Sequence, residues 1–288
     1  MARVSYSQYS MWASCPYKWK LNYVDGLSEF RNSINMLFGS AMHHVLQEYL
    51  KVMYTKTINE ADELDLLDML KDKMRELYTE SKKEENFKEF TSKEQMAEFY
   101  ADGIELLNFF KKNKSDYFSK KGYSLLGVEL PLNIKLTEHI NFTGFLDVVI
   151  KDDLTNDIYI IDFKTSTMGW RDGMKKDESK TSQLILYKNF YAQQYDIPIE
   201  KVHVEFIILK RRLYENVEFP QKRFQRFEPA SGKPTVKKIV ANFDNFITEC
   251  YNEDGTFIEN KKYDKIPSKK NCQYCEFNDS PELCDKRA

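Results

Sequence analysis

Residues 140–166 have the sequence INFTGFLDVVIKDDLTNDIYIIDFKTS, and this stretch decides which fold is expected. Its two runs of aliphatic, β-branched and aromatic residues favour strands, and the segment KDDLTND between them favours a turn. The first run carries Asp147, and the second carries Asp162 and Lys164. Because charges within apolar strands are costly to bury without partners, a hairpin that brings these residues together predicts a bound divalent cation and an activated water.

The spacing of these charged residues indicates how they would act. Side chains alternate along a strand, so Asp162 and Lys164 share one face. The two aspartates and the backbone carbonyl of Phe163 are oxygen ligands suited to Mg²⁺ or Mn²⁺. Lys164 could position or deprotonate the metal-bound water, or stabilise charge on a phosphate. The alternative is a salt bridge on an exposed strand face, which the motif DFK alone would favour.

The segments on either side predict an α/β fold. Residues 123–136 continue the strand pattern, so three strands in a meander are expected. Residues 179–196 form an amphipathic helical pattern that ends before Pro198, and residues 201–212 predict another strand. A helix between two strands of one sheet predicts a βαβ crossover. Residues 235–252 predict one more helix.

The first third of the chain has helical periodicity, most clearly in residues 38–54, 62–80 and 92–112. We therefore expect one α/β domain over residues 1–288, with a mixed central sheet flanked by helices. A helical insertion would span about residues 45–120, and the catalytic sheet and helix residues 121–210. The tail, residues 265–288, has little periodicity and would be held by cysteines packing with the region of Cys15.

Composition narrows the class of protein. The chain has 288 residues, 42% of them hydrophobic and 31% charged, with a net charge of −2, which argues against a nonspecific polycation but not against a nuclease. No secretory signal pattern and no apolar run of membrane-spanning length occur, so a cytoplasmic protein without a membrane partner is expected. In that compartment, the five cysteines favour metal ligands or free thiols over disulfides.

A basic segment follows the predicted strand 201–212. Aromatic residues are interleaved among its basic residues, which are Lys210, Arg211, Arg212, Lys222, Arg223 and Arg226. Lys210, Arg211 and Arg212 are the predicted DNA contacts of a phosphate-binding arm. A solvated hairpin explains the pattern equally well.

Five elements in order along the chain resemble the RecB-like branch of the PD-(D/E)XK nucleases. They are Gly39-x-x-x-His43, Glu129, GFLD with Asp147, DFK with Asp162 and Lys164, and Gln183-x-x-x-Tyr187. The resemblance covers about residues 5–195 and the cysteine tail. The ordered set is specific, whereas DFK alone is weak, and Leu146 replaces the family's usual proline before the first aspartate.

The resemblance implies the restriction-endonuclease-like fold and metal-dependent DNA cleavage, most often by an exonuclease. It makes His43 a metal ligand with Asp147 and Asp162, although a lone helical histidine more often serves packing. It gives Glu129 a second metal position or an outer-shell role, with an exposed strand glutamate as the alternative. Gln183 and Tyr187 share a helix face and would approach the scissile strand or the catalytic lysine.

The cysteines predict a second metal centre. Cys272, Cys275 and Cys284 have the spacing C-x2-C-x8-C, and Cys15 could supply a fourth thiolate. The layout resembles the iron–sulfur nucleases of the same branch, including the AddB-type and CRISPR-associated RecB-like exonucleases, which implies a [4Fe–4S] cluster. Zinc is the alternative. Cys250 lies in an apolar helical pattern and is expected to be buried.

The function expected from these features is a Mg²⁺- or Mn²⁺-dependent DNA exonuclease. Two alternatives are a non-catalytic DNA-binding or assembly module on a nuclease fold, and a metal-dependent endonuclease or RNase. Because the chain has no P-loop motif, any unwinding would come from a helicase or recombination partner. Compact nucleases of this kind occur in bacterial and phage replication or recombination systems.

Overall fold

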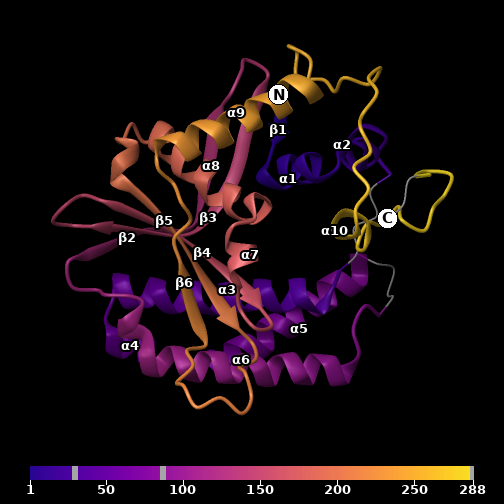
Figure 1. The fold of residues 1–288 in the computed structure, drawn as a ribbon. Coiled ribbons are helices and arrows are strands. Elements are labelled where there is room, and N and C mark those ends of the chain that lie inside the picture. Colours follow the sequence, from indigo (N-terminus) through magenta and orange to yellow (C-terminus); the bar gives the residue numbers. More distant parts are fainter. Residues whose placement is uncertain (28–31, 85–88, 286–288) are drawn as a thin grey trace.

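The structure is a computed structural model that describes residues 1–27, 32–84 and 89–285. Its centre is a six-stranded mixed sheet with helices on both faces (Figure 1). The strands are β1 (Ala2–Val4), β2 (Tyr123–Lys135), β3 (Ile140–Asp152), β4 (Ile158–Ser166), β5 (Val202–Lys210) and β6 (Phe224–Phe227). The predicted α/β class with a mixed, helix-flanked sheet is confirmed.

β3 is the strand on which the sheet is organised. It pairs antiparallel with β2 along one edge, and on the other edge it pairs with β1 at its start and with β4 near its end. β4 and β5 are parallel, and helix α8 (Glu178–Gln194) connects them. The predicted meander and the predicted βαβ crossover are therefore both present.

Apolar residues alternate between the two faces of the sheet and build two cores. On one face, Val149, Ile160 and Phe206 belong to a core shared with α1 (Tyr6–Ser14), α8 and α9 (Lys233–Cys250). On the other face, Val148 and Ile161 belong to a core shared with the long helices α3 (Ile34–Thr55), α5 (Leu66–Glu84) and α6 (Lys93–Asn113). Figure 1 shows these two helical layers above and below the strands.

The helical segment expected at residues 45–120 corresponds to the second part of α3, then α4 (Ile58–Asp62), α5, α6 and a 3-10 turn at Lys114–Asp116. α3 begins earlier than that segment, at Ile34, where Ser33 caps it. Ser92 and Gln95 form a capping box that starts α6. These helices cover the sheet directly, so α3 places its side chains at the strands.

Short elements complete the fold. They are α2 (Pro16–Trp19), a π-helical turn (Lys20–Val24), α7 (Asp172–Lys175), a 3-10 turn (Ile199–Lys201) and α10 (Lys269–Cys272). Tyr17 ties the tail to α2, because its backbone N–H donates to Asp264 and its hydroxyl donates to Leu283, both at 3.0 Å. No helix in the described ranges is long and apolar enough to cross a membrane.

Candidate active site

The candidate site forms where β3 and β4 separate. Their ladder ends at the pair of Val148 with Ile161, so Asp147 and Asp162 are the next residues on the two strands. Beyond that pair, the backbone N–H of Phe163 donates to Asp147 Oδ2 at 2.8 Å. A carboxylate thus replaces a ladder hydrogen bond, and two acidic side chains lie side by side in a nearly buried position.

Helix α3 adds a histidine and a glutamine to this site. His43 Nδ1 lies 3.2 Å from Asp147 Oδ2. One turn further along the same helix face, Gln47 Nε2 donates to Glu129 Oε1 at 2.6 Å and to the Asp147 carbonyl at 3.2 Å. Glu129 adopts a φ of 46°, which non-glycine residues rarely adopt in a strand. Such an outlier beside a polar cluster points to a functional constraint.

A chain of polar contacts leads from the acidic pair to α8. Lys164 Nζ lies 2.7 Å from Asp162 Oδ2 and donates to Gln183 Oε1 at 3.0 Å. Gln183 Nε2 in turn donates to the hydroxyl of Tyr187 at 3.2 Å. The i, i+4 spacing predicted that Gln183 and Tyr187 share a face, and the contacts place that face against the lysine.

Gly144 lets Tyr187 approach the sheet. A Cβ atom at Gly144 would lie 3.2 Å from both Cε1 and Oη of Tyr187, closer than most real contacts. The glycine of the GFLD motif therefore makes room for the buried tyrosine ring beside the site, and a larger residue would push that ring away.

Burial dominates the electrostatics of the site. It raises the pKa of Asp147 to about 6, against the opposing effect of Lys164. It also raises the pKa of Asp162 to about 6, where Lys164 opposes the shift and Asp147 adds to it. Burial lowers the pKa of His43 and raises that of Tyr187 to about 12. When both aspartates are ionised, two buried negative charges face the single positive charge of Lys164, so the site has an excess of negative charge.

The donor set fits a hard divalent cation. Asp162 Oδ2 is buried and, within the described residues, has no partner with hydrogen-bond geometry, although Lys164 lies close to it. In the same ranges, no three His, Cys, Asp or Glu side chains are already arranged around a common ion position. His43, Asp147 and Asp162 nevertheless offer the nitrogen and oxygen ligands, and the excess negative charge, that Mg²⁺ or Mn²⁺ would satisfy.

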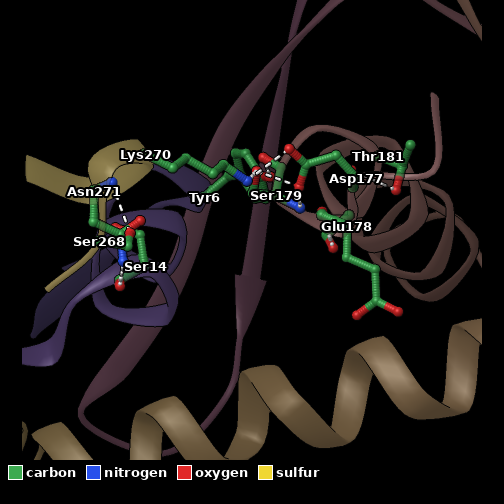
Figure 2. A network of polar contacts seen from close by, with 10 residues as sticks. Tyr6, Ser14, Asp177, Glu178, Ser179, Thr181, Ser268, Lys270 and Asn271 are labelled. Atoms are coloured by element: carbon green, nitrogen blue, oxygen red, sulfur yellow. Dashed lines mark hydrogen bonds and ion pairs between the residues drawn. The ribbon is translucent and has the colours of Figure 1, made fainter. Parts of the chain in front are cut away.

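A polar network holds the start of α8, the helix that carries Gln183. Asp177 caps the helix by accepting from the backbone N–H of Ser179, and Lys270 of α10 donates to Asp177 Oδ2 at 2.7 Å (Figure 2). Tyr6 of α1 donates to the Ser179 carbonyl at 2.9 Å. Three segments far apart in the sequence thus meet at one helix end.

Comparison with known proteins identifies the family. The model of the PD-(D/E)XK nuclease superfamily matches residues 3–280. The chain belongs to this superfamily. A solved structure, "Putative exonuclease" from Eubacterium rectale, is similar in fold, with a TM-score of 0.50 and 14% identity over 95% of this chain and 86% of that one. No curated protein matches the chain.

The four cysteines expected at the second metal centre of this PD-(D/E)XK chain lie together. Cys15, Cys272, Cys275 and Cys284 all line one small cavity between the N-terminal helices and the tail. Burial raises the pKa of Cys275, and Cys15 is near enough to add to that shift. Among the described residues, no three potential ligands are already arranged around a common metal position. The four cysteines therefore lie near one another without forming a complete metal site.

The basic arm of the nuclease is paired with its own helix α6. Arg211 Nη1 lies 2.8 Å from Asp102 Oδ2, and the guanidinium stacks 3.8 Å above the ring of Phe99. Arg212 pairs with Glu98. Burial lowers the pKa of Lys210. These contacts give the two arginines structural partners, and DNA contact by Lys210, Arg211 and Arg212 stays a prediction.

The structure brings together every residue expected at the catalytic centre: His43, Glu129, Asp147, Asp162, Phe163, Lys164, Gln183 and Tyr187. Gln47 was missed, although it lies four residues after His43, the spacing that places side chains on one helix face. Cys250 is fully buried, as expected.

Proposed function

We propose that the chain is a Mg²⁺- or Mn²⁺-dependent DNA exonuclease of the RecB-like branch. The observation that carries the proposal is the convergence of His43, Asp147, Asp162 and Lys164 at the point where β3 and β4 separate. Membership of a nuclease superfamily supports the reaction class. The order of the motifs supports the branch and, with it, the exonuclease mode and the DNA substrate.

His43, Asp147, Asp162 and the carbonyl of Phe163 would hold the cation. When bound, such a cation acts as a Lewis acid and lowers the pKa of a coordinated water. Lys164 has three N–H donors: one donates to Gln183 Oε1, and the ion pair with Asp162 Oδ2 occupies a second side of the ammonium. The third is available to a phosphate oxygen, and the fixed ammonium would stabilise the charge that grows there. Gln183 and Tyr187 hold the lysine in that position.

The test is degradation of end-labelled DNA by the purified full chain with Mg²⁺ or Mn²⁺. Asp162→Ala should abolish cleavage and leave folding and DNA binding largely intact. The matched control is Asp157→Ala at the start of the same strand region, where the carboxylate pairs with Lys201 away from the site. Wild-type cleavage rates in Asp162→Ala would overturn the proposal.

The substrate arms of the same assay separate the alternatives. An exonuclease degrades linear DNA progressively from an end and leaves closed circular DNA intact. Cleavage of the circle would favour an endonuclease, and preferential loss of a labelled RNA would favour an RNase. Binding without cleavage under every metal condition would favour a non-catalytic DNA-binding or assembly module. Adding a helicase would reveal dependence on a partner that unwinds duplexes.

We also propose that Cys15, Cys272, Cys275 and Cys284 hold a [4Fe–4S] cluster, with zinc as the alternative. The cavity that the four side chains line supports this proposal, since closed sites take four thiolates. Anaerobically purified protein should be brown, with iron and sulfide in equal amounts by chemical analysis. Colourless protein that contains one zinc per chain would overturn the iron–sulfur assignment.

A further inference from the structure

The sheet face opposite Asp162 buries a charged residue that the catalytic site does not use. Glu205 of β5 shares its row with Ile207 and Leu209, which are fully buried, and lies beside Ile161 of β4 in register. Only 7% of Glu205 is exposed. A carboxylate in such a row costs stability relative to an aliphatic side chain, so its presence points to a role beyond packing.

Arg226 of β6 is the partner of this carboxylate. Its Nε donates to Glu205 Oε1, and its Nη2 donates to Oε2 at 2.7 Å. In the described contacts, this pairing uses two of the five guanidinium N–H groups, and each carboxylate oxygen retains capacity to accept another hydrogen bond. The Arg226 side chain is half exposed. The pair therefore offers donors next to acceptors at the edge of the sheet.

A cavity of about 340 Å³ opens over this pair. Its walls include four tyrosines, Tyr54, Tyr117, Tyr123 and Tyr159, of which Tyr117 lies in the loop at residues 115–119. Tyr123 meets Tyr159 edge to face at 6.3 Å, and Tyr159 stacks on His203 at 5.0 Å, so the rings are held in place. A cavity of this size with aromatic walls and a few fixed polar groups suits a small planar ligand.

We propose that this cavity binds a guanine base. Around its perimeter, guanine presents the acceptors N7 and O6 on the Hoogsteen edge and then the donors N1–H and N2–H₂ on the Watson–Crick edge. Arg226 would donate to N7 and O6, which is the usual arginine contact to guanine, and Glu205 would accept from N1–H and N2–H₂. The tyrosine rings would pack against the faces of the base. No other common base offers two adjacent acceptors followed by two adjacent donors.

The proposed guanine site is separate from the candidate active site. Ile161 lines the cavity, whereas the next residue, Asp162, points to the other face of the sheet. No residue identified at the catalytic centre lines the cavity. Guanine binding and phosphodiester cleavage should therefore respond to different substitutions, and the failure of one assignment would leave the other standing.

The test is calorimetric titration of the full chain with guanosine, adenosine and cytidine in metal-free buffer. A nucleoside carries no phosphate, so it avoids contacts at the catalytic centre. Guanosine should bind about tenfold more tightly than the other two, or better. Arg226→Lys keeps the positive charge beside Glu205 but loses the pair of parallel N–H donors of the guanidinium. This variant should bind guanosine about tenfold more weakly and cleave DNA at the wild-type rate. Arg212→Lys, on the exposed arm, is the matched control and should bind normally.

Two further measurements keep the test decisive. If Arg226→Lys folds poorly, Glu205→Gln replaces it, because glutamine keeps the size of the side chain and loses the acceptor pair. Asp162→Ala should bind guanosine like the wild type. A thymidine oligonucleotide with one guanine should then be tested as a competitor of guanosine. Competition would identify nucleic acid as the source of the base, and lack of competition would identify a free guanine compound. Both outcomes support the site. No guanosine binding, or equal binding in Arg226→Lys, would overturn it.

Discussion

At the scale of single residues, the buried pair of Asp147 and Asp162 lowers the stability of the metal-free protein when both carboxyl groups are ionised. The folded state raises the pKa of Asp162 from 3.8 to about 6 because the carboxyl is buried. The folded chain therefore binds more protons than the unfolded chain between these two values. Stability is greatest below the unfolded pKa, falls as the pH rises through this window, and levels off above it.

Asp162→Asn should remove this loss of stability at neutral pH. We expect the variant without metal to be more stable than the wild type at pH 7.5, by at most about 2 to 3 kcal/mol, and similar to it at pH 4. Mg²⁺ or Mn²⁺ should raise the melting temperature of the wild type at pH 7.5 and have little effect on the variant. Thermal unfolding at both pH values measures this, and an equally large metal effect in the variant would contradict it.

Gly144 allows a second test at this scale. Gly144→Ala should displace Tyr187, because the new methyl group would meet the ring at 3.2 Å. We expect a loss of about 1 to 3 kcal/mol in the free energy of unfolding and slower cleavage. Gly173→Ala is the control, since nothing lies within 4 Å of a Cβ there. Chemical denaturation and the DNA assay give the two readouts; similar behaviour of both variants would refute the packing argument.

At the scale of elements, α8 links Lys164 of the candidate active site to the rest of the molecule. Its 17 residues carry Gln183 and Tyr187, and its start is held by the Asp177 cap and Lys270. The sequence predicted this helix from its amphipathic pattern and placed the two site residues on one face. It did not predict the contacts of Lys270 and Tyr6, because they depend on how distant segments pack.

Asp177→Ala should shorten or loosen the start of α8. Loss of the cap should cost about 1 kcal/mol in the free energy of unfolding and reduce cleavage, because Gln183 follows within two turns. Lys270→Ala removes the ion pair with Asp177 and a 3.3 Å hydrogen bond to Ser179 Oγ, but the lysine is two-thirds exposed, so the loss should cost less than about 0.5 kcal/mol. Urea unfolding and cleavage rates compare the two variants, and a larger effect from Lys270→Ala would reverse the assignment.

The basic arm illustrates what sequence alone leaves open. Its arginines predicted either phosphate contacts or a solvated hairpin, and their carboxylate partners lie about a hundred residues earlier on α6. Arg211→Ala should cost about 2 to 3 kcal/mol, because Arg211 is nearly buried and its loss leaves Asp102 unpaired. Arg212→Ala should cost less than about 1 kcal/mol, since that pair is exposed. Denaturation of both variants tests the order, and equal costs would contradict it.

At the scale of the whole molecule, the strands and crossover of the sheet could be predicted because each segment has a clear periodicity. The pairing of β1 with β3 could not, because a three-residue strand carries no such pattern. The residues of the candidate active site were predicted from their order along the chain. The backbone conformation of Glu129 and the role of Gln47 were not, since both arise only once α3 lies against β2.

If the proposed metal centre holds the tail, its removal from the cysteine cavity should weaken the attachment of the tail. After treatment with a chelator, we expect a loss of about 2 kcal/mol or more, roughly 5 °C in melting temperature, and faster proteolysis within residues 265–285. Cys275→Ser should already behave like the treated protein, and the chelator should change it no further. Identical proteolysis of treated and untreated wild type would argue against a metal that holds the tail.

The hydroxyl of Tyr17 donates to the carbonyl of Leu283, a partner 266 positions later in the chain. During synthesis, the surroundings of α2 are therefore complete only after Leu283 has left the ribosome. A product that is truncated before Leu283 would lack this contact beside its first helices, and we expect it to be an early target for cellular proteases.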